Sequence, residues 1–356
     1  MGNHNQDFEQ ETQGAEARRP AWRRVVRLLA VLLAAELGLM GFAVLKLNSL
    51  GYFENLPIVK KGEDTGQIGQ PEGLEPGGQG GEELDNLDLG SSQGKTPVYS
   101  VKPLDSDVIN ILLLGIDTWE SGGSGRADLN MIVSIDRKNN TIKLASILRD
   151  TLVPIEGHDW NRLNAAFAFG GAGLSINTVN KAFGLDIQRY VRLDFSAIRD
   201  IIDAVGGVDI ELTEKEITYL RSYGYKVTRG AGVKHLDGDT ALAYSRIRKI
   251  DSDFRRTQRQ RNVMTAALSK VRAMGVMDAM DLMNTLLPKV KTNITTGSAI
   301  QLAQEVLAMG DGAIKQMAVP VAGSFSDKKY KGMSIISIDF DKNKNALRSF
   351  LYGGGE

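Results

Sequence analysis

The sequence contains no cysteine, and it has only three histidines. The absence of cysteine excludes disulfide bonds and metal sites built from thiolates. His4, His158 and His235 are scattered along the chain, so neither a structural zinc site nor a Ser-His-Asp triad is expected. The 43 basic and 43 acidic residues cancel, so net charge gives no general attraction to nucleic acid or acidic lipid. At 356 residues the chain has room for one large or two ordinary domains.

The N-terminal part of the chain predicts a membrane anchor. Residues 1–24 are polar and unpatterned, which predicts a disordered tail. The apolar run at residues 25–47 approaches the roughly 20 residues that a spanning helix needs, and its many apolar side chains offset Glu36. Arginines precede this run and only Lys46 follows it closely, so the tail is expected in the cytoplasm and the remainder outside. A cleaved signal peptide is the alternative, but no small-x-small site ends the run.

Residues 48–104 have a composition typical of a flexible linker, acidic and rich in Gly, Gln and Pro. Within this range, residues 90–96 resemble a P-loop. They are one residue too short, and neither a strand before them nor a helix after them is predicted. The folded extracytoplasmic domain is expected to comprise residues 105–356.

Strand and helix patterns alternate through this domain. Apolar runs of β-forming residues predict strands at Val108–Leu114, Met131–Ile135, Ile142–Ile147, Tyr190–Leu193, Val208–Leu212, Gln316–Val321 and Ser334–Ile338. Helical spacing predicts helices at Leu174–Phe183, Phe195–Val205, from near Phe254, and at Met277–Leu287, Ala299–Met309 and Lys342–Leu351. The alternation predicts an α/β fold with one central mixed β-sheet sandwiched by helices, in an α-β-α arrangement.

The region 244–261 carries seven basic residues in a chain that is neutral overall. Arg246 and Arg248 would point the same way on an extended segment. Ser252 or Asp253 is suited to cap the following helix. Three polar side chains share one face of that helix by their spacing: Arg256, Arg259 and Gln260. Forked guanidinium donors suit phosphate oxygens, so the region predicts an anion site, with a solvated basic helix face as the alternative.

Two aspartates flank a Gly/Ser loop between the first two predicted strands. Asp117 follows the first strand and Asp128 opens the second, so both are expected at one edge of the sheet. Carboxylates without histidine suit Mg²⁺, with Mn²⁺ as an alternative ion, completed by phosphate and water. Arg126, Arg149 and Asp150 stand at nearby loop ends, although each alone also fits a turn or surface residue. Carboxylates together with arginines predict a site for a magnesium-bound pyrophosphate.

Seven motifs carry a resemblance to a known family. They are NILLLGID at 110–117, GRAD at 125–128, SILRD at 146–150, NRLNAAF at 161–167, DAVGGV at 203–208, LDGDTALAYSRIR at 236–248 and DFRRTQRQ at 253–260. In this order they resemble the LytR-CpsA-Psr family, most strongly over residues 105–270. That family also has an N-terminal membrane anchor before an external catalytic domain.

The resemblance implies an enzyme that takes a glycopolymer phosphate from an undecaprenyl-pyrophosphate carrier and attaches it to the C6 hydroxyl of muramic acid in peptidoglycan. The implied metal ligands are Asp117 and Asp128. The implied pyrophosphate clamp is Arg126, Arg149, Arg246, Arg248, Arg256, Arg259 and Gln260. The implied catalytic residues are Arg149, Asp150, Arg246 and Arg248. The prenyl chain of the family lies in an apolar pocket between sheet and helices, for which residues 174–183 and 195–205 are candidates here.

The sequence departs from the family pattern at two positions. Leu148 stands where proline is frequent, and Arg162 stands where lysine is common. Arg162 keeps the positive charge but changes the geometry of the donor group. Asp150 is a candidate to accept the proton of the acceptor hydroxyl, and its alternative role is to orient Arg149.

Three other functions fit parts of the pattern. A polyprenyl-pyrophosphate pyrophosphatase would use the same site with water as acceptor. Clustered arginines also suit a nucleic-acid-binding regulator of the cell envelope, but a domain outside the membrane meets no chromosome, so no nucleic acid is expected as partner. A non-catalytic wall-binding module would not depend on Mg²⁺. The expected partners are the undecaprenyl-pyrophosphate-linked glycopolymer, peptidoglycan and the lipid bilayer, and the identity of the polymer stays open between wall teichoic acid, capsule and others.

Overall fold

The computed structural model describes residues 53, 54, 56, 58–60, 68, 71–76, 96–116, 125–310 and 312–353. The predicted tail at residues 1–24 and the predicted anchor at residues 25–47 lie outside this part, as does Asp117. None of the described helices combines the length and apolar character that crossing a bilayer requires.

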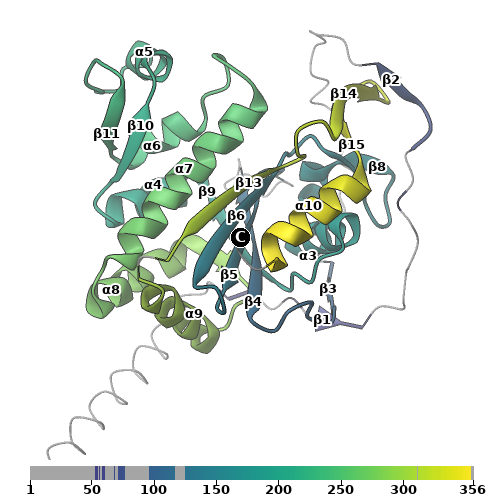
Figure 1. Ribbon diagram of the computed structural model, residues 1–356, viewed down its shortest axis with the longest axis horizontal. Coiled ribbons are helices and arrows are strands. Elements are labelled where there is room, and N and C mark those ends of the chain that lie inside the picture. Colours follow the sequence, from purple (N-terminus) through teal and green to yellow (C-terminus); the bar gives the residue numbers. More distant parts are fainter. Residues whose placement is uncertain are drawn as a thin grey trace, which may run out of the picture. The chain divides into compact units, whose positions relative to one another are not determined.

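A six-stranded mixed sheet forms the centre of the fold (Figure 1). Its strand order is β12 (Val290–Thr292), β9 (Arg189–Asp194), β4 (Val108–Ile116), β5 (Ala127–Asp136), β6 (Thr141–Ile147) and β13 (Ile314–Val319). The strand β5 runs antiparallel to both of its neighbours, β4 and β6, whereas β9 is parallel to β4 and β13 is parallel to β6. Every residue of β4 and β6 is buried, which explains why these strands read as continuous apolar runs.

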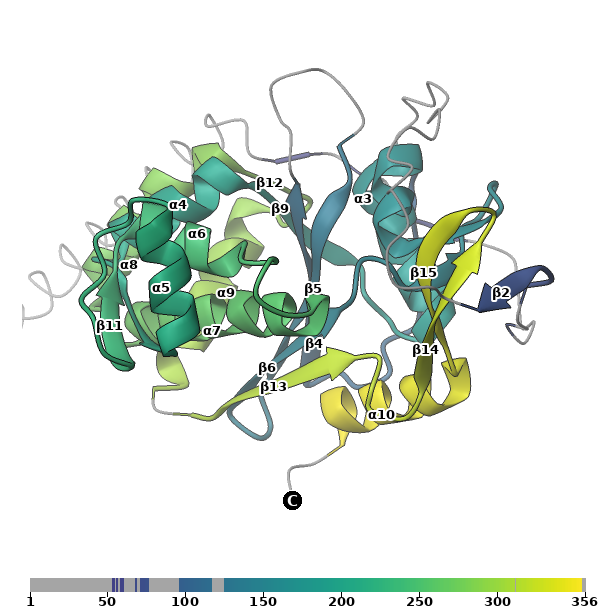
Figure 2. The ribbon, with the colours of Figure 1, turned by 90° about the horizontal axis from the view of Figure 1, so that it is seen from above.

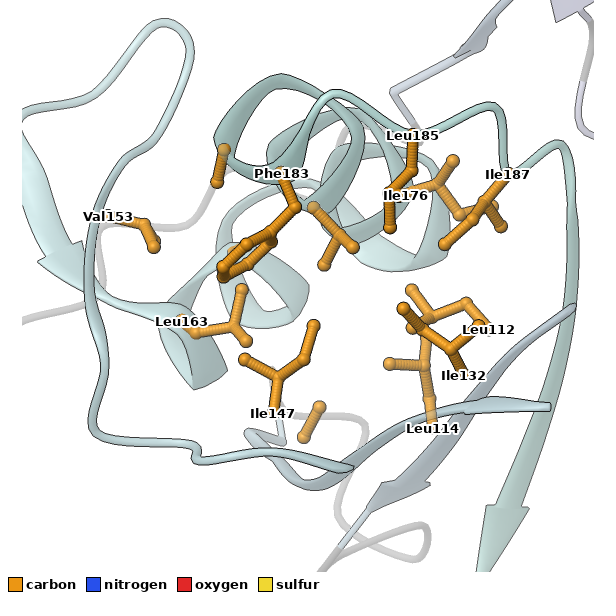
Figure 3. Packing of buried hydrophobic residues seen from close by; sticks show 14 of the residues in the cluster. Leu112, Leu114, Ile132, Ile147, Val153, Leu163, Ile176, Phe183, Leu185 and Ile187 are labelled. Carbon is orange, nitrogen blue, oxygen red and sulfur yellow. The ribbon is translucent and has the colours of Figure 1, made fainter. Parts of the chain in front are cut away.

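Helices cover both faces of this sheet, which confirms the predicted sandwich (Figure 2). One face carries α3 (Leu163–Phe183) and α10 (Phe340–Tyr352). The other carries α4 (Phe195–Ala204), α6 (Gly238–Ser245), α7 (Asp253–Arg272), α8 (Val276–Leu286) and α9 (Thr296–Ala308). Between α3 and the sheet lies a dry core, in which Leu112 and Ile132 face Ile176 and Phe183 (Figure 3).

Helix α3 begins at Leu163, well before the predicted start at Leu174. A kink lies inside this longer helix, where Gly170 and Gly171 have non-helical backbone angles. The backbone N–H of Thr96 donates to the carbonyl of Gly170 at 3.2 Å, so the chain crosses the helix at this point. A Cβ atom on Gly173 would lie 1.8 Å from the carbonyl oxygen of Thr96, which explains the need for glycine there.

The expectation of a single sheet is wrong for two predicted strands. The strand β10 (Val208–Leu212) pairs with β11 (Gly232–Leu236) in a separate hairpin that encloses α5 (Glu214–Ser222). Its residues alternate between buried and exposed, a pattern that does not suit a sheet covered on both faces. The strand β15 (Met333–Ile338) pairs with β14 (Phe325–Tyr330), which also pairs with β2 (Leu74–Pro76).

Parts of the predicted linker, residues 48–104, pack on the domain. The backbone N–H of Glu54 donates to the carbonyl of Thr292 in β12 at 2.8 Å, and the hydroxyl of Tyr190 donates to the Glu54 carboxylate. The short strand β1 (Ile58–Val59) pairs in parallel with β3 (Val98–Tyr99). These described residues are therefore held against the domain and do not form a free tether.

Short elements complete the described chain. They are the strand pair β7 (Leu152–Pro154) and β8 (Trp160–Arg162), and the 3₁₀ helix η1 (Leu287–Lys289). The pair β7–β8 links the end of β6 to the start of α3, and so connects two elements that frame the candidate site.

Candidate active site

The candidate site lies at the end of the sheet where β5 begins and β6 ends. Because these two strands are antiparallel, the start of one meets the end of the other. Asp128 is the second residue of β5, and Arg149 lies two residues beyond the last residue of β6. Their side chains meet: the Nη1 of Arg149 lies 2.7 Å from Oδ1 of Asp128.

Asp128 is held by two arginines from different parts of the chain. Its second oxygen, Oδ2, accepts from Nη2 of Arg248 at 3.0 Å, and Arg248 follows α6 in the sequence. Burial alone would raise the pKa of Asp128, but Arg149, Arg256 and Arg248 together hold that pKa below its ordinary value. The carboxylate is therefore ionised at neutral pH and stabilises the positive charges around it.

Asp150 lies between two further guanidinium groups. The Nε of Arg149 lies 3.6 Å from its Oδ2, and the Nη1 of Arg162 lies 3.5 Å from its Oδ1. Arg162, whose role the sequence left in doubt, is buried beside this carboxylate. Burial would lower the pKa of Arg149, but Asp150 and Asp128 reverse the effect and raise it. The aspartate thus fixes Arg149 from the side opposite to Asp128.

The first turn of α7 brings a second acid–base pair into the site. The Nη2 of Arg256 lies 2.8 Å from Oδ1 of Asp253, three residues earlier on the helix. Burial and the nearby charges of Arg149 and Arg248 lower the pKa of Arg256, although Asp253 opposes them. Burial is also the main cause that raises the pKa of Asp253. The sequence indicated Asp253 only as a possible helix cap, and the cap position is in fact Ser252.

Several buried polar atoms of the site have no hydrogen-bond partner in the described part of the chain. They are Nε and Nη1 of Arg256, Nε of Arg149 and Oε1 of Gln260. An unsatisfied buried donor costs about 1–3 kcal/mol, so a folded protein keeps such groups where a ligand or water satisfies them. We call Arg149, Arg248 and Arg256, gathered around Asp128, the arginine cluster. Its unused donors suit an anion with several acceptor oxygens.

Arg259 does not join the arginine cluster. It is buried and its Nε donates to Oε1 of Glu216 at 2.7 Å, while its Nη1 donates to the carbonyl of Ile247 at 3.1 Å. Its guanidinium also forms an ion pair with Asp251. Burial would lower the pKa of Arg259, but Asp251 and Glu216 raise it. The shared helix face predicted for Arg256 and Arg259 therefore leads to two different ion networks.

Three further predicted site residues are not seen among the described contacts of the arginine cluster: Arg246, Arg126 and Asp117. The guanidinium carbon of Arg246 lies 4.4 Å from the centre of the Phe195 ring, so Arg246 and Arg248 point to different neighbours. Arg126 is half-buried immediately before β5. Asp117 lies outside the described residues, and Ile116 just before it pairs with Ala127 at the start of β5.

The described residues fit a magnesium ion only if phosphate oxygens of the substrate also coordinate the ion. Nowhere in the described chain do three or more acidic or histidine side chains gather as a metal site. Asp128 offers an ionised oxygen donor, which is the ligand type that Mg²⁺ prefers. Mg²⁺ is often bound through one or two carboxylates with the rest of its shell from phosphate and water, and this donor set fits that arrangement.

Comparison with known proteins connects this site to one group of relatives. The sequence profile of the LytR_cpsA_psr family matches residues 85–349. The polyisoprenyl-teichoic acid–peptidoglycan teichoic acid transferase TagT of Bacillus subtilis (strain 168) is 34% identical over 220 residues, which are 59% of this chain and 68% of TagT. The corresponding TagU of Bacillus mycoides (strain KBAB4) is 36% identical over 230 residues, which are 60% of this chain and 73% of TagU.

Solved structures of similar proteins share the fold. TagT bound to LIIa-WTA has a TM-score of 0.59 and 29% identity, over 70% of this chain and 94% of that chain. The LytR-CPS2A-psr family protein YwtF (TagT) with bound octaprenyl pyrophosphate lipid has a TM-score of 0.56 and 27% identity over the same shares.

Proposed function

The chain belongs to the LytR_cpsA_psr family, and from this premise we propose that it is a phosphotransferase of the cell envelope. It moves an anionic glycopolymer from an undecaprenyl-pyrophosphate carrier to the C6 hydroxyl of muramic acid in peptidoglycan. Two relatives carry the name of teichoic acid transferases, and a similar structure holds a polyprenyl pyrophosphate. The observation that carries the proposal is the arginine cluster around Asp128, in which the guanidinium of Arg256 is buried and has donors that no described residue uses.

The chemistry needs positioning and neutralisation of charge more than covalent help. The hydroxyl oxygen of the acceptor forms a bond to the phosphorus that carries the glycopolymer, and the bond from that phosphorus to the polyprenyl phosphate breaks. Negative charge grows on the leaving phosphate as the bond breaks. Arg256 keeps unused donors in a buried setting, where fixed donors stabilise such charge more strongly than water does, and Arg149 adds its positive charge beside them.

The ion pairs of the site hold these donors in place before the substrate arrives. Asp128 fixes Arg149 and Arg248, and Asp150 fixes Arg149 from its other side. Such pre-arranged groups do not have to reorganise during the reaction, which lowers the barrier. Gln260 lies one turn beyond Arg256 on α7, and it belongs to the proposed clamp through its position in the family motif.

Asp117 and Asp128 are the residues proposed to hold Mg²⁺, or Mn²⁺ in its place. When bound, the ion supplies positive charge against the oxygens of the diphosphate. The proposed pyrophosphate clamp also includes Arg126, Arg246 and Arg259, but only because of their positions in the family motifs. In the structure Arg246 contacts Phe195 and Arg259 pairs with Glu216.

The donor lipid also determines the proposed location. A polyprenyl carrier stays in the bilayer, which suits a domain anchored to the membrane by residues 25–47. The arginines before this segment favour a cytoplasmic N-terminus and a domain outside the cell membrane. A reporter fused after Glu356 is expected to give signal only in an extracytoplasmic format. Cytoplasmic signal from that fusion contradicts this placement.

Product analysis tests the activity. The full chain in detergent, with Mg²⁺, lipid-linked glycopolymer and peptidoglycan, is expected to give polymer that resists removal from purified glycan strands. Free phosphorylated polymer as the main product would instead identify a pyrophosphatase, with water as acceptor in the same site. Arg256→Gln removes a buried guanidinium of the cluster, and Arg255→Gln, which changes the exposed arginine beside it, is the matched control.

A further inference from the structure

Transfer to a hydroxyl group requires a proton acceptor, and three described carboxylates at the site are candidates. Asp128 is the second residue of β5, Asp150 lies three residues after the end of β6, and Asp253 is the first residue of helix α7. The surroundings of the three carboxylates differ in the number of guanidinium groups that hold them. A carboxylate held by two guanidinium groups is suited to fix these arginines in place. A carboxylate held by only one is better able to accept a proton.

Asp128 is poorly suited to accept a proton. Each of its oxygens accepts from a different arginine, at 2.7 Å from Arg149 and 3.0 Å from Arg248. Its pKa lies below the ordinary value, because these charges outweigh the effect of burial. Its lone pairs already serve two cations, and the proposed metal ion adds a third positive charge.

Asp150 is also held from two sides. One oxygen faces the Nε of Arg149 and the other faces the Nη1 of Arg162, at 3.6 Å and 3.5 Å. Its backbone carbonyl accepts from the N–H of Ile336, which fixes the chain at this residue. The position between two guanidinium groups suits a residue that orients Arg149.

Asp253 differs because one guanidinium nitrogen serves both of its oxygens. The Nη2 of Arg256 lies 2.8 Å from Oδ1 and 3.1 Å from Oδ2, and the carboxylate keeps further lone pairs for another donor. The side chain is 24% exposed, so a hydroxyl group is able to reach it.

The charged groups around Asp253 come from three elements. Arg256 lies on its own helix, Arg149 and Asp150 follow β6, and Arg248 follows α6. Burial and the charge of Asp150 raise the pKa of Asp253, while the three arginines oppose them, and the net direction is upward. A carboxylate with a raised pKa is a better proton acceptor at neutral pH than an ordinary aspartate.

Arg256 places this carboxylate next to the expected position of the diphosphate. One nitrogen of its guanidinium, Nη2, binds Asp253, while Nε and Nη1 are buried without a partner in the described chain. A phosphoryl group that binds either of these free nitrogens lies within the width of one guanidinium group of the carboxylate. A hydroxyl group that attacks that phosphorus comes within reach of Asp253.

We propose that Asp253 accepts the proton of the acceptor hydroxyl in the transfer reaction, and this inference rests on the proposed function. The hydroxyl oxygen forms its bond to phosphorus as the bond to the polyprenyl phosphate breaks. The hydroxyl proton moves to a carboxylate oxygen of Asp253 and is released to water after the product leaves. Asp128 and Asp150 keep their arginines in place throughout.

The test compares Asp253→Asn with Asp150→Asn in the full chain with Mg²⁺. Loss of a positioned proton acceptor lowers the rate by about 10²- to 10⁴-fold, so Asp253→Asn is expected to lower kcat by that factor and to leave KM for the lipid-linked donor within about threefold. The fall of the wild-type rate toward acid pH is expected to disappear in Asp253→Asn and to persist in Asp150→Asn. A residue that only positions Arg256 would instead raise KM and keep this pH dependence.

Two further measurements keep the result interpretable. Asp253→Glu retains a carboxylate, and is expected to recover part of the activity and the decrease in rate toward acid pH. If Asp253→Asn does not fold, this variant provides the test. The proposal is overturned if Asp253→Asn has a kcat near that of the wild type. It is also overturned if folded Asp253→Glu shows no decrease in rate toward acid pH. Failure of the wild-type protein to join polymer to glycan strands would count against the proposed function and not against Asp253.

Discussion

The Nε of Arg259 donates to Oε1 of Glu216 at 2.7 Å, although the two residues are 43 positions apart in the sequence. The other carboxylate oxygen of Glu216 accepts from the backbone N–H of Thr213 at 2.9 Å and so caps helix α5. Arg259 also binds Asp251 and the carbonyl of Ile247, which flank residues 248–250. One buried guanidinium thus connects helices α5 and α7 with the loop that presents Arg248 to Asp128.

Arg259→Gln is expected to destabilise the protein. The substitution leaves Glu216 as a buried carboxylate without its cation, and breaking a buried ion pair costs about 3 kcal/mol or more. Urea unfolding of the full domain measures this loss as a lower midpoint. Arg255→Gln on the exposed side of α7 is the control, and is expected to stay within about 0.5 kcal/mol of wild type. Equal stability of the two variants would contradict a structural role for Arg259.

Pyrophosphate with Mg²⁺ is expected to stabilise the wild-type protein through Arg256. A ligand at about 100 times its Kd adds about 2.7 kcal/mol to the free energy of unfolding. Arg256→Gln removes the two free donors, Nε and Nη1, and is expected to lose most of this stabilisation. Thermal unfolding with and without the ligand measures the difference, and Arg255→Gln should respond as wild type does. An unchanged shift in Arg256→Gln would show that the anion binds elsewhere.

Arg261→Met is expected to stabilise the protein by about 1–2 kcal/mol at neutral pH. Arg261 is buried on α7, and in the described chain its Nε and Nη1 have no partner and only Gln258 accepts from it. Burial lowers the pKa of Arg261 from 12.5 to about 10. The folded state therefore holds this proton less tightly than the unfolded state. The cost is fully present below pH 10 and shrinks as the pH rises toward 12.5.

Chemical denaturation at pH 7 and at pH 9 tests this prediction for Arg261, since both values lie below the folded pKa. The gain of Arg261→Met over wild type should be the same at the two values. A variant that loses transfer activity and gains no stability would instead assign Arg261 to ligand binding.

Asp136→Asn is expected to make the domain less stable at neutral pH. Asp136 and Lys143 form a buried pair at 2.8 Å, and Lys143 also donates to the carbonyl of Leu351 in the last helix. Burial would raise the pKa of Asp136, but Asn139 and Lys143 hold it below its ordinary value of 3.8. The stabilisation is therefore present above pH 3.8 and is lost as the pH falls through the lower folded value.

At neutral pH, the loss in Asp136→Asn is expected to be about 3 kcal/mol, because the lysine is left buried without its partner. The difference from wild type should narrow below pH 4 and vanish in stronger acid. Asp327→Asn, which changes an exposed residue of β14, is the control with the same change in charge. A difference that is constant from pH 7 to pH 2 would exclude the ion pair as its cause.

The centre of the sheet was predictable because β4, β5 and β6 are buried on both faces along most or all of their length, and therefore read as apolar runs. The predicted strand at Val208–Leu212 has the observed bounds, but its membership of the central sheet was wrong, since pairing depends on a partner strand some 20 residues later. Helix α3 was predicted too short because Gly170 and Gly171 break the helical pattern. That a helix continues across them depends on packing against Thr96, which is a contact between distant residues.

The types of residue at the candidate site were predictable, but the directions in which their side chains point were less so. Asp128, Arg149, Arg248 and Arg256 come together as the sequence led us to expect. Three residues along a helix correspond to a rotation of about 300°, so Arg256 and Arg259 differ in direction by about 60°. That difference is enough for Arg259 to meet Glu216, and no local pattern shows where Glu216 lies. Asp253 was expected at the start of a helix, but its place among the arginines comes only from the fold.

The contact of Glu54 with Thr292 has a practical consequence for any shortened form of the protein. The strand β12 is the outermost strand of the central sheet, and Phe53 and Glu54 cover its free side. A fragment that starts at residue 105 would leave the main-chain groups of this strand open to water. Uncovered strand edges are sites where the sheets of neighbouring molecules join, so such a fragment should self-associate, while one that starts before residue 53 stays monodisperse.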